Sequence, residues 1–175
     1  MTCTSIDVMA RGMQTVGSSQ REVISIPGTH RAGPFIELRQ SVPSRVNAIS
    51  SAVEQLMRFI TTFRVNDGSE GDIDVALREA LANAIVHGNK GDARKHVDVV
   101  CRCGIDGELL ITVRDEGDGF DPAAVPDPTA VENLLSGHGR GLHLIRALMD
   151  KVHFEQGGTV LQMRRGALLR EERSL

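Results

Sequence analysis

The middle of the chain contains the stretch Lys95-His-Val-Asp-Val-Val-Cys-Arg-Cys-Gly-Ile-Asp-Gly-Glu-Leu-Leu-Ile-Thr-Val-Arg114. Its first half alternates apolar and polar residues, and a glycine-containing turn at 104–107 leads into a second apolar segment at 108–114, so we expect two strands joined by a tight turn. Strands joined this way run antiparallel. One face of the first strand carries Val97, Val99, Cys101 and Cys103, so both thiols are expected to be buried rather than to bind a metal.

Further elements are predicted on both sides of this hairpin. Before it we expect a strand from Phe35 to Arg39, a helix from Pro43 to about Phe63 and a second helix at about 71–88. After it we expect a long proline-containing loop, a helix at about 139–150 and two strands at 152–156 and 159–165. This order predicts an α+β fold, a two-layer sandwich with a mostly antiparallel mixed sheet and its helices on one face. A Rossmann fold is disfavoured.

Length and composition predict one domain. The chain has 175 residues, of which 41% are hydrophobic and 25% charged, as in ordinary globular proteins. We expect a flexible N-terminal arm at 1–32, in which an apolar cluster at 23–26 could add a strand, a folded domain at 33–167 and a short charged tail at 168–175.

Several partners and locations are disfavoured by composition. A net charge of −3 and the lack of Trp and Tyr argue against direct binding of nucleic acid. No apolar run approaches the roughly 20 residues of a membrane-spanning helix, so no membrane association is expected. Three cysteines without a secretory leader predict a reduced, cytoplasmic protein.

The first candidate motif is Glu79-Ala-Leu-Ala-Asn83-Ala-Ile-Val-His87-Gly88. Spacing by four residues predicts that Glu79, Asn83 and His87 stack on one face of a helix that is otherwise apolar. A carboxylate and an amide at this separation can hold a divalent cation and supply a base beside a phosphate. The alternative is a polar stripe that simply faces water.

The second motif, Asp115-Glu-Gly117-Asp-Gly119-Phe-Asp121, begins where the hairpin ends. Alternate glycines let the backbone turn sharply and approach a ligand, and a carboxylate at a strand end can accept a hydrogen bond from an exocyclic amine. The alternative is an acidic turn. A calcium loop is disfavoured because no glutamate stands at its twelfth position.

The third motif, Gly137-His138-Gly139-Arg140-Gly141-Leu142, leads directly into a predicted helix. The start of a helix presents unpaired amides and a positive dipole end, which together favour phosphate. The spacing matches neither a Walker A motif nor G-x-G-x-x-G, so the common phosphate-binding loops do not account for it.

In this order, an E-x-x-x-N helix, a D-x-G-x-G turn and a G-x-G-x-G-L helix start resemble the histidine-kinase-like ATPase superfamily with the Bergerat ATP-binding fold. Within that superfamily, the segments 79–88 and 141–152 are most similar to the anti-sigma-factor serine kinases. The resemblance covers about Phe35 to Arg165 and implies that ATP and Mg²⁺ are the cofactors.

The resemblance also implies roles for individual residues. Glu79 would be the general base and Asn83 a magnesium ligand, while Asp115 would accept from the adenine amino group. Other expected nucleotide contacts are Gly117 and Gly119 beside the base, Gly139, Arg140, Gly141 and Leu142 near the phosphates, and Thr159 behind Asp115. Residues 121–138 would form the ATP lid. Arg140 and Lys90 could each either meet a phosphate or point to solvent.

The activity implied by the resemblance is phosphorylation of an antagonist protein on Ser or Thr. A sigma factor would be the second partner, and partner switching would regulate transcription. The resemblance also implies a homodimer through the strand near Phe35 and the following helix. One alternative is a non-catalytic, nucleotide-gated anti-sigma module. Another is the ATPase domain of a histidine-kinase-type system, which is disfavoured because His30 is the only histidine upstream of the motifs and has no heptads around it. The retention of Glu79 favours chemistry over binding alone.

Overall fold

The computed structural model describes residues 7–10, 34–64, 68–120 and 140–166. The strands in these ranges are β1 (Asp7–Ala10), β2 (Phe35–Pro43), β3 (His96–Gly104), β4 (Leu109–Asp115), β5 (Lys151–Glu155) and β6 (Val160–Arg165). The α-helices are α1 (Ile49–Phe63), α2 (Glu70–Ala82) and α3 (Arg140–Leu148). Short helical turns are η1 (Val46–Ala48), η2 (Asn83–Gly88) and η5 (Gln156–Gly158).

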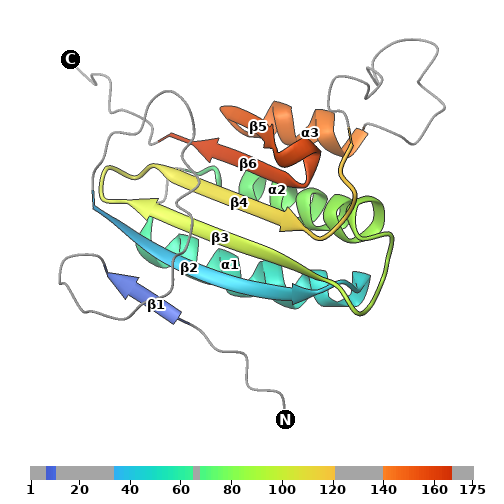
Figure 1. Ribbon diagram of the computed structural model, residues 1–175. Helices are drawn as coiled ribbons and strands as arrows, with labels where there is room; N and C mark the ends of the chain where they lie inside the picture. The colour runs from blue at the N-terminus through green and yellow to red at the C-terminus, as the bar shows by residue number, and fades with distance from the viewer. Residues whose placement is uncertain (1–6, 11–33, 65–67, 121–139, 167–175) are drawn as a thin grey trace, which may run out of the picture.

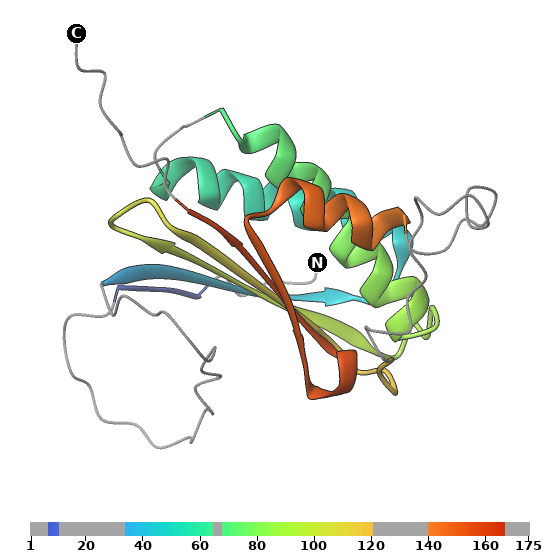
Figure 2. The ribbon, with the colours of Figure 1, turned by 90° about the horizontal axis from the view of Figure 1, so that it is seen from above.

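The strands form one six-stranded sheet in the order β1-β2-β3-β4-β6-β5 (Figure 1). Each neighbouring pair is antiparallel, and the central hairpin pairs Val97 with Asp115 at one end and Cys103 with Leu109 at the other. All three α-helices lie on the same side of the sheet (Figure 2). The predicted two-layer α+β fold is confirmed, with every described pairing antiparallel.

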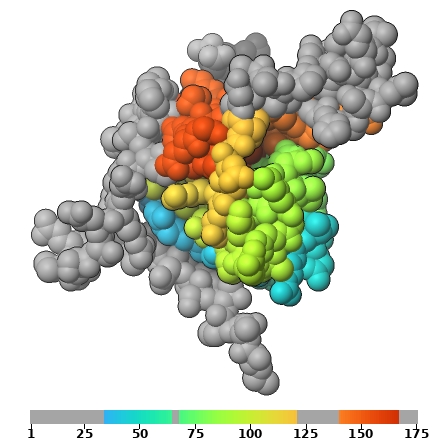
Figure 3. Space-filling view, turned by 45° about the vertical axis from the view of Figure 1, so that its right-hand side comes forward, coloured from blue at the N-terminus to red at the C-terminus, as the bar shows by residue number. Residues whose placement is uncertain are grey.

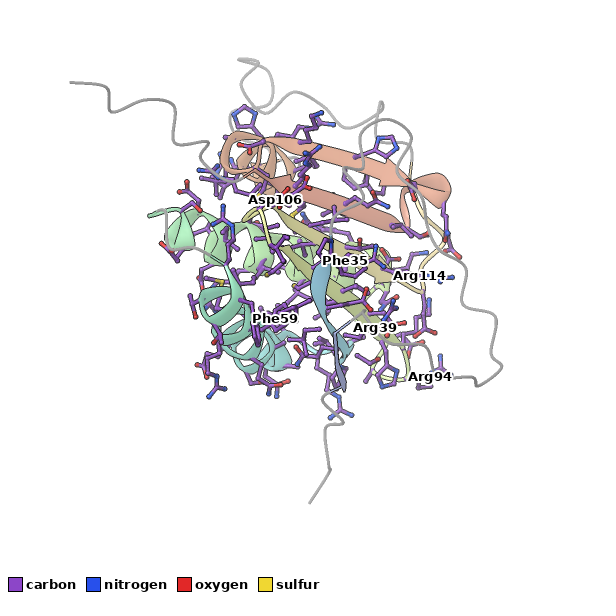
Figure 4. All side chains as sticks on the ribbon, turned by 90° about the vertical axis from the view of Figure 1, so that its left-hand side faces the viewer. Phe35, Arg39, Phe59, Arg94, Asp106 and Arg114 are labelled. Carbon is purple, nitrogen blue, oxygen red and sulfur yellow. The ribbon has the colours of Figure 1, made fainter. Side chains whose placement is uncertain are left out.

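The hydrophobic core lies between the sheet and the helices. Cys101 and Cys103 of β3 are buried in it, as the alternation of β3 predicts, and burial raises the pKa of the Cys103 thiol to about 11. Figure 4 shows the two layers from the side: Phe59 of α1 lies on the helix side, whereas Arg39 and Arg114 project from the opposite side of the sheet. α2 packs between α1 and α3, which brings the first and third sequence motifs to one place.

The strand that begins at Phe35 is longer than predicted, and the following helix starts later. β2 continues to Pro43, which pairs with His96, and α1 begins only at Ile49 after η1. Leu38 and Val42 both point into the core, so the alternation of inward residues continues to Val42 and favours a strand up to that residue. Proline, which has no N–H to donate, is tolerated at the end of a strand. The helix-start interpretation of Pro43 was wrong.

The N-terminal arm contains a strand that was not predicted at its position. β1 pairs antiparallel with β2, from Asp7 opposite Arg39 to Ala10 opposite Ile36. The apolar cluster at 23–26, the ATP-lid segment at 121–138, Gly139 and the tail at 168–175 lie outside the described residues. Within the described ranges, no helix is both long and apolar enough to cross a membrane.

Candidate functional site

The first sequence motif ends in a π-helical turn. α2 is regular up to Ala82, but in η2 the backbone N–H of Asn89 donates to the carbonyl of Ala84, five residues back, at 2.7 Å. Such turns insert an extra residue into a helix and occur frequently at functional sites. The four-residue spacing therefore holds from Glu79 to Asn83 but not onward to His87, whose side chain is exposed.

Gly141, in the first turn of α3, brings the first and third motifs into contact. A Cβ atom placed on Gly141 would lie 2.6 Å from Oε2 of Glu79 and 3.3 Å from Nδ2 of Asn83. Only a glycine fits here without displacing these polar groups. The half-buried side chains of Glu79 in α2 and Asn83 in η2 therefore face the first turn of α3, and the expected polar stripe does not simply face water.

The start of α3 offers the amides that a phosphate needs. Amides in the first turn of an α-helix have no partner within the helix, and the helix dipole adds positive potential there. Arg140 is the first residue of α3 and is exposed, whereas the Leu142 side chain is buried. Leu142 can therefore contribute to an anion site through its backbone and not through its side chain.

Asp115 is the last residue of β4, and its carboxylate lies against Gly88 at the end of η2. A Cβ on Gly88 would come within 2.6 Å of both carboxylate oxygens of Asp115. A Cβ on Gly117 would meet Asp115 Oδ1 at 2.7 Å and would also clash with the carbonyl of Gly88. The backbone N–H of Gly117 donates to the same Oδ1 at 2.8 Å. The two glycines form a close-fitting wall around one carboxylate.

Burial raises the pKa of Asp115 above its ordinary value, although the hydrogen bond from Gly117 acts in the opposite direction. Because burial disfavours the charged form, this half-buried carboxylate gains from each further hydrogen-bond donor that stabilises its charge. A ligand that donates a hydrogen bond to Asp115 would supply one, and a perturbed carboxylate in a glycine-lined site is a candidate for ligand recognition.

The turn after Asp115 packs against the β5–β6 connection. Gly119 has a φ of +79° and lies against the carbonyl of Gly157, to which the N–H of Phe120 donates at 2.8 Å. Thr159 precedes β6 rather than lying on it, and its carbonyl accepts from the N–H of Asp115 at 3.0 Å. Figure 3 shows the turn (gold) between the α2–η2 segment (green) and the β5–β6 segment (orange).

Residues 42–165 match the family model described as the histidine kinase-like ATPase domain. The chain belongs to this family. The match spans every element from the end of β2 to β6, and therefore all the described residues that form the site.

Curated proteins with known names are similar to part of the chain. It is 35% identical over 91 residues to the serine-protein kinase RsbW of Bacillus subtilis, covering 48% of this chain and 56% of the relative. It is 37% identical over 109 residues to the anti-sigma F factor of Clostridium acetobutylicum, covering 58% of this chain and 73% of the relative. The chain spans little more than half the length of the RsbW relatives.

The site of this ATPase-family chain fits a nucleotide with a divalent cation. At Gly141 and Gly117 the place of a Cβ atom is taken by Glu79 and by Asp115 and Gly88, so the backbone packs closely against these groups. In the part of the chain that the structure describes, no three His, Cys, Asp or Glu side chains gather as a complete metal site. Mg²⁺ is commonly held by one or two protein oxygens together with substrate phosphates, and Asn83 provides an oxygen of that kind beside Gly141.

Two residues just beyond η2 connect the helix motif to the Asp115 turn. The fully buried Asn89 was not among the predicted site residues. Its side chain donates to the carbonyl of His96 at 2.9 Å and accepts from the N–H of Glu116 at 2.8 Å. Lys90, for which two orientations were considered, forms an exposed ion pair with Asp118 at 2.7 Å. In the sequence, Asn89 is marked only by its position directly after Gly88, the glycine that ends the helix.

Proposed function

We propose that this chain is an ATP-dependent protein kinase of the anti-sigma-factor type, which phosphorylates a partner protein on Ser or Thr. The observation that carries the proposal is the contact of Gly141 with both Glu79 and Asn83, which brings a carboxylate and an amide to the phosphate-binding end of a helix. The names of the relatives, serine-protein kinase and anti-sigma F factor, support the same proposal.

Adenine recognition is assigned to Asp115. Its carboxylate would accept from the exocyclic amino group of adenine, which adds a donor to a group whose charged form burial disfavours. Gly117 and Gly119 would line the base, and Thr159, whose carbonyl holds the Asp115 amide, would support Asp115 from behind. Guanine has a carbonyl where adenine has this amino group, so the site would discriminate against GTP.

Phosphate binding is assigned to the start of α3. The backbone amides of Arg140, Gly141 and Leu142 would contact the phosphates, with Gly139 preceding them in the chain. Asn83 would be the magnesium ligand through its side-chain oxygen. Bound Mg²⁺ supplies charge neutralisation of the triphosphate.

Glu79 is assigned as the general base. Its carboxylate would accept the proton of the partner's hydroxyl group while the hydroxyl oxygen forms a bond to the γ-phosphorus. The bond between the γ-phosphorus and the bridging oxygen breaks, and ADP leaves with the electron pair of that bond. A nucleotide-binding module without activity would not need a carboxylate at this position, so Glu79 favours the kinase over the binding-only alternative.

The proposed partners are an antagonist protein that accepts the phosphate and a sigma factor, and the proposed location is the cytoplasm, where ATP is available. The proposed catalytic domain comprises residues 33–167, and the arm at 1–32 and the tail at 168–175 would lie outside it. It also includes a homodimer through the strand near Phe35 and α1, which molecular mass in solution would test.

The experiment is a transfer assay with γ-labelled ATP, Mg²⁺ and the small proteins encoded next to the gene of this chain. We expect acid-stable label on a serine or threonine of one of these proteins, and loss of the label with Glu79→Ala. Acid-labile label on a histidine would instead support a histidine-kinase-type system, and ATP binding without transfer to any protein would support the binding-only module.

A further inference from the structure

We propose that Asn89 is a positioning residue of the nucleotide site, which holds the Asp115 turn at a fixed place relative to the α2–η2 segment. The inference rests on the ATP site of the proposed function, and its binding test needs no phosphate acceptor. Asn89 touches no atom that reacts, so its effect passes through Asp115.

Asn89 is anchored on its own segment by the backbone. Its N–H closes the π-helical turn with the carbonyl of Ala84 at 2.7 Å, and it lies directly after Gly88, the glycine that faces the Asp115 carboxylate. The side chain of Asn89 is fully buried. The position of Asn89 is therefore tied to η2 through its backbone.

The amide group of Asn89 lies just beyond the last residue pair of β3 and β4. The paired residues end with Val97 opposite Asp115. One step further, the carbonyl of His96 accepts from Asn89 Nδ2, and the N–H of Glu116 donates to Asn89 Oδ1. The N–H of His96 donates in turn to the Glu116 carboxylate at 2.7 Å. Backbone groups that would extend the ladder are thus satisfied by side chains, and the chain can turn away from β3 immediately after Asp115.

Only an amide of this length supplies both hydrogen bonds. A carboxylate could accept from Glu116 but could not donate to His96, and an alanine would remove the side-chain partner of both part-buried backbone groups. Because Asp115 is the residue next to Glu116, loss of the Asn89 bridge would release one side of the turn that presents the Asp115 carboxylate. The opposite side would still be held by the bond from Asp115 N–H to Thr159.

The test measures binding and catalysis separately in Asn89→Ala and Asn89→Asp. We expect Asn89→Ala to weaken ATP and ADP alike by roughly tenfold, the size of one ordinary hydrogen bond, and Asn89→Asp to fall between this variant and the wild type. The rate of phosphoryl transfer at saturating ATP should change by less than roughly threefold, because Glu79 and Asn83 are not moved. Isothermal titration calorimetry with ATP and with ADP gives the affinities.

Val53→Ala provides the matched control, because Val53 is a fully buried residue of α1 and this substitution destabilises the fold without touching the site. Its affinity for ATP should equal that of the wild type at a temperature where all variants are folded. If Asn89→Ala does not fold, Asn89→Asp carries the test. Wild-type affinity in a folded Asn89 variant would overturn the inference while leaving the ATP site intact. A wild-type protein that binds no ATP would overturn the proposed function itself.

Discussion

Gly141 in the first turn of α3 and Glu79 in α2 are in direct contact, and a Cβ on the glycine would lie 2.6 Å from the Glu79 carboxylate. Gly141→Ala should therefore displace the carboxylate or shift the start of α3. We expect transfer of phosphate to fall by roughly 10²-fold or more, because a general base works only within hydrogen-bond reach of its proton.

Gly71→Ala is the matched control for Gly141→Ala. Gly71 also lies in the first turn of a helix, α2, but a Cβ on it would meet nothing within 4 Å. We expect this substitution to leave transfer unchanged and to stabilise the protein by about 0.5–1 kcal/mol, the helix preference of alanine over glycine. Equal activity of the two variants in the transfer assay would contradict the placement of Gly141 beside the reacting groups.

Asp115→Asn should weaken ATP by about 1.5–3 kcal/mol, the value of a hydrogen bond to a charged group. The asparagine oxygen can still accept from the Gly117 N–H, so the turn should keep its conformation. Calorimetric titration with ATP measures the loss, and Asp98→Asn, an exposed carboxylate on β3, serves as control. A loss of the same size in both variants would point to general electrostatics rather than to base recognition.

The raised pKa of Asp115 has a defined effect on stability. Between its unfolded and folded pKa values the folded state binds more protons than the unfolded state, so stability falls as pH rises through this window. The stabilisation by the protonated form is present below the unfolded pKa and is lost above the folded pKa. We expect Asp115→Asn, compared with the wild type by urea unfolding without nucleotide, to remove this part of the pH dependence.

Glu79→Ala should leave ATP affinity within a few-fold but lower phosphoryl transfer by a factor of roughly 10²–10⁴, the usual contribution of a general base. Asn83→Ala should lower both, because the magnesium ligand organises the triphosphate. Titration and the transfer assay together distinguish the two variants. Wild-type transfer by the Glu79 variant would place the base elsewhere.

The fold class was predictable from the sequence because alternation and tight turns act locally. The hairpin from Lys95 to Arg114 needs no distant partner to be recognised, and its inward cysteines follow from the two-residue period. The end of β2 was missed because Gln40 interrupts the apolar alternation. In the structure Gln40 donates to Gln55 of α1 at 3.2 Å, a contact between distant residues that the local pattern does not reveal.

The site was predictable to the extent that its residues lie in motifs. Glu79, Asn83, Asp115 and Gly141 do, and the structure brings Glu79 and Asn83 together with Gly141. The role of Asn89 was not predictable, because it depends on a hydrogen bond to Glu116, 27 residues further along the chain. The π-helical turn was not predictable either, although its bond from Asn89 to Ala84 is local. A helix that appears regular in its apolar spacing gives no local indication that its last turn will widen.

The claim most open to direct test is that the Asp115 pocket binds adenine. Calorimetric titration of the wild-type protein with ATP and, separately, with GTP, both with Mg²⁺, measures it without knowledge of any partner protein. We expect ATP to bind roughly tenfold more tightly or better, since GTP cannot donate to Asp115 at this position and leaves the half-buried carboxylate without this donor. Equal affinity for the two nucleotides, or no binding of ATP, would contradict the account.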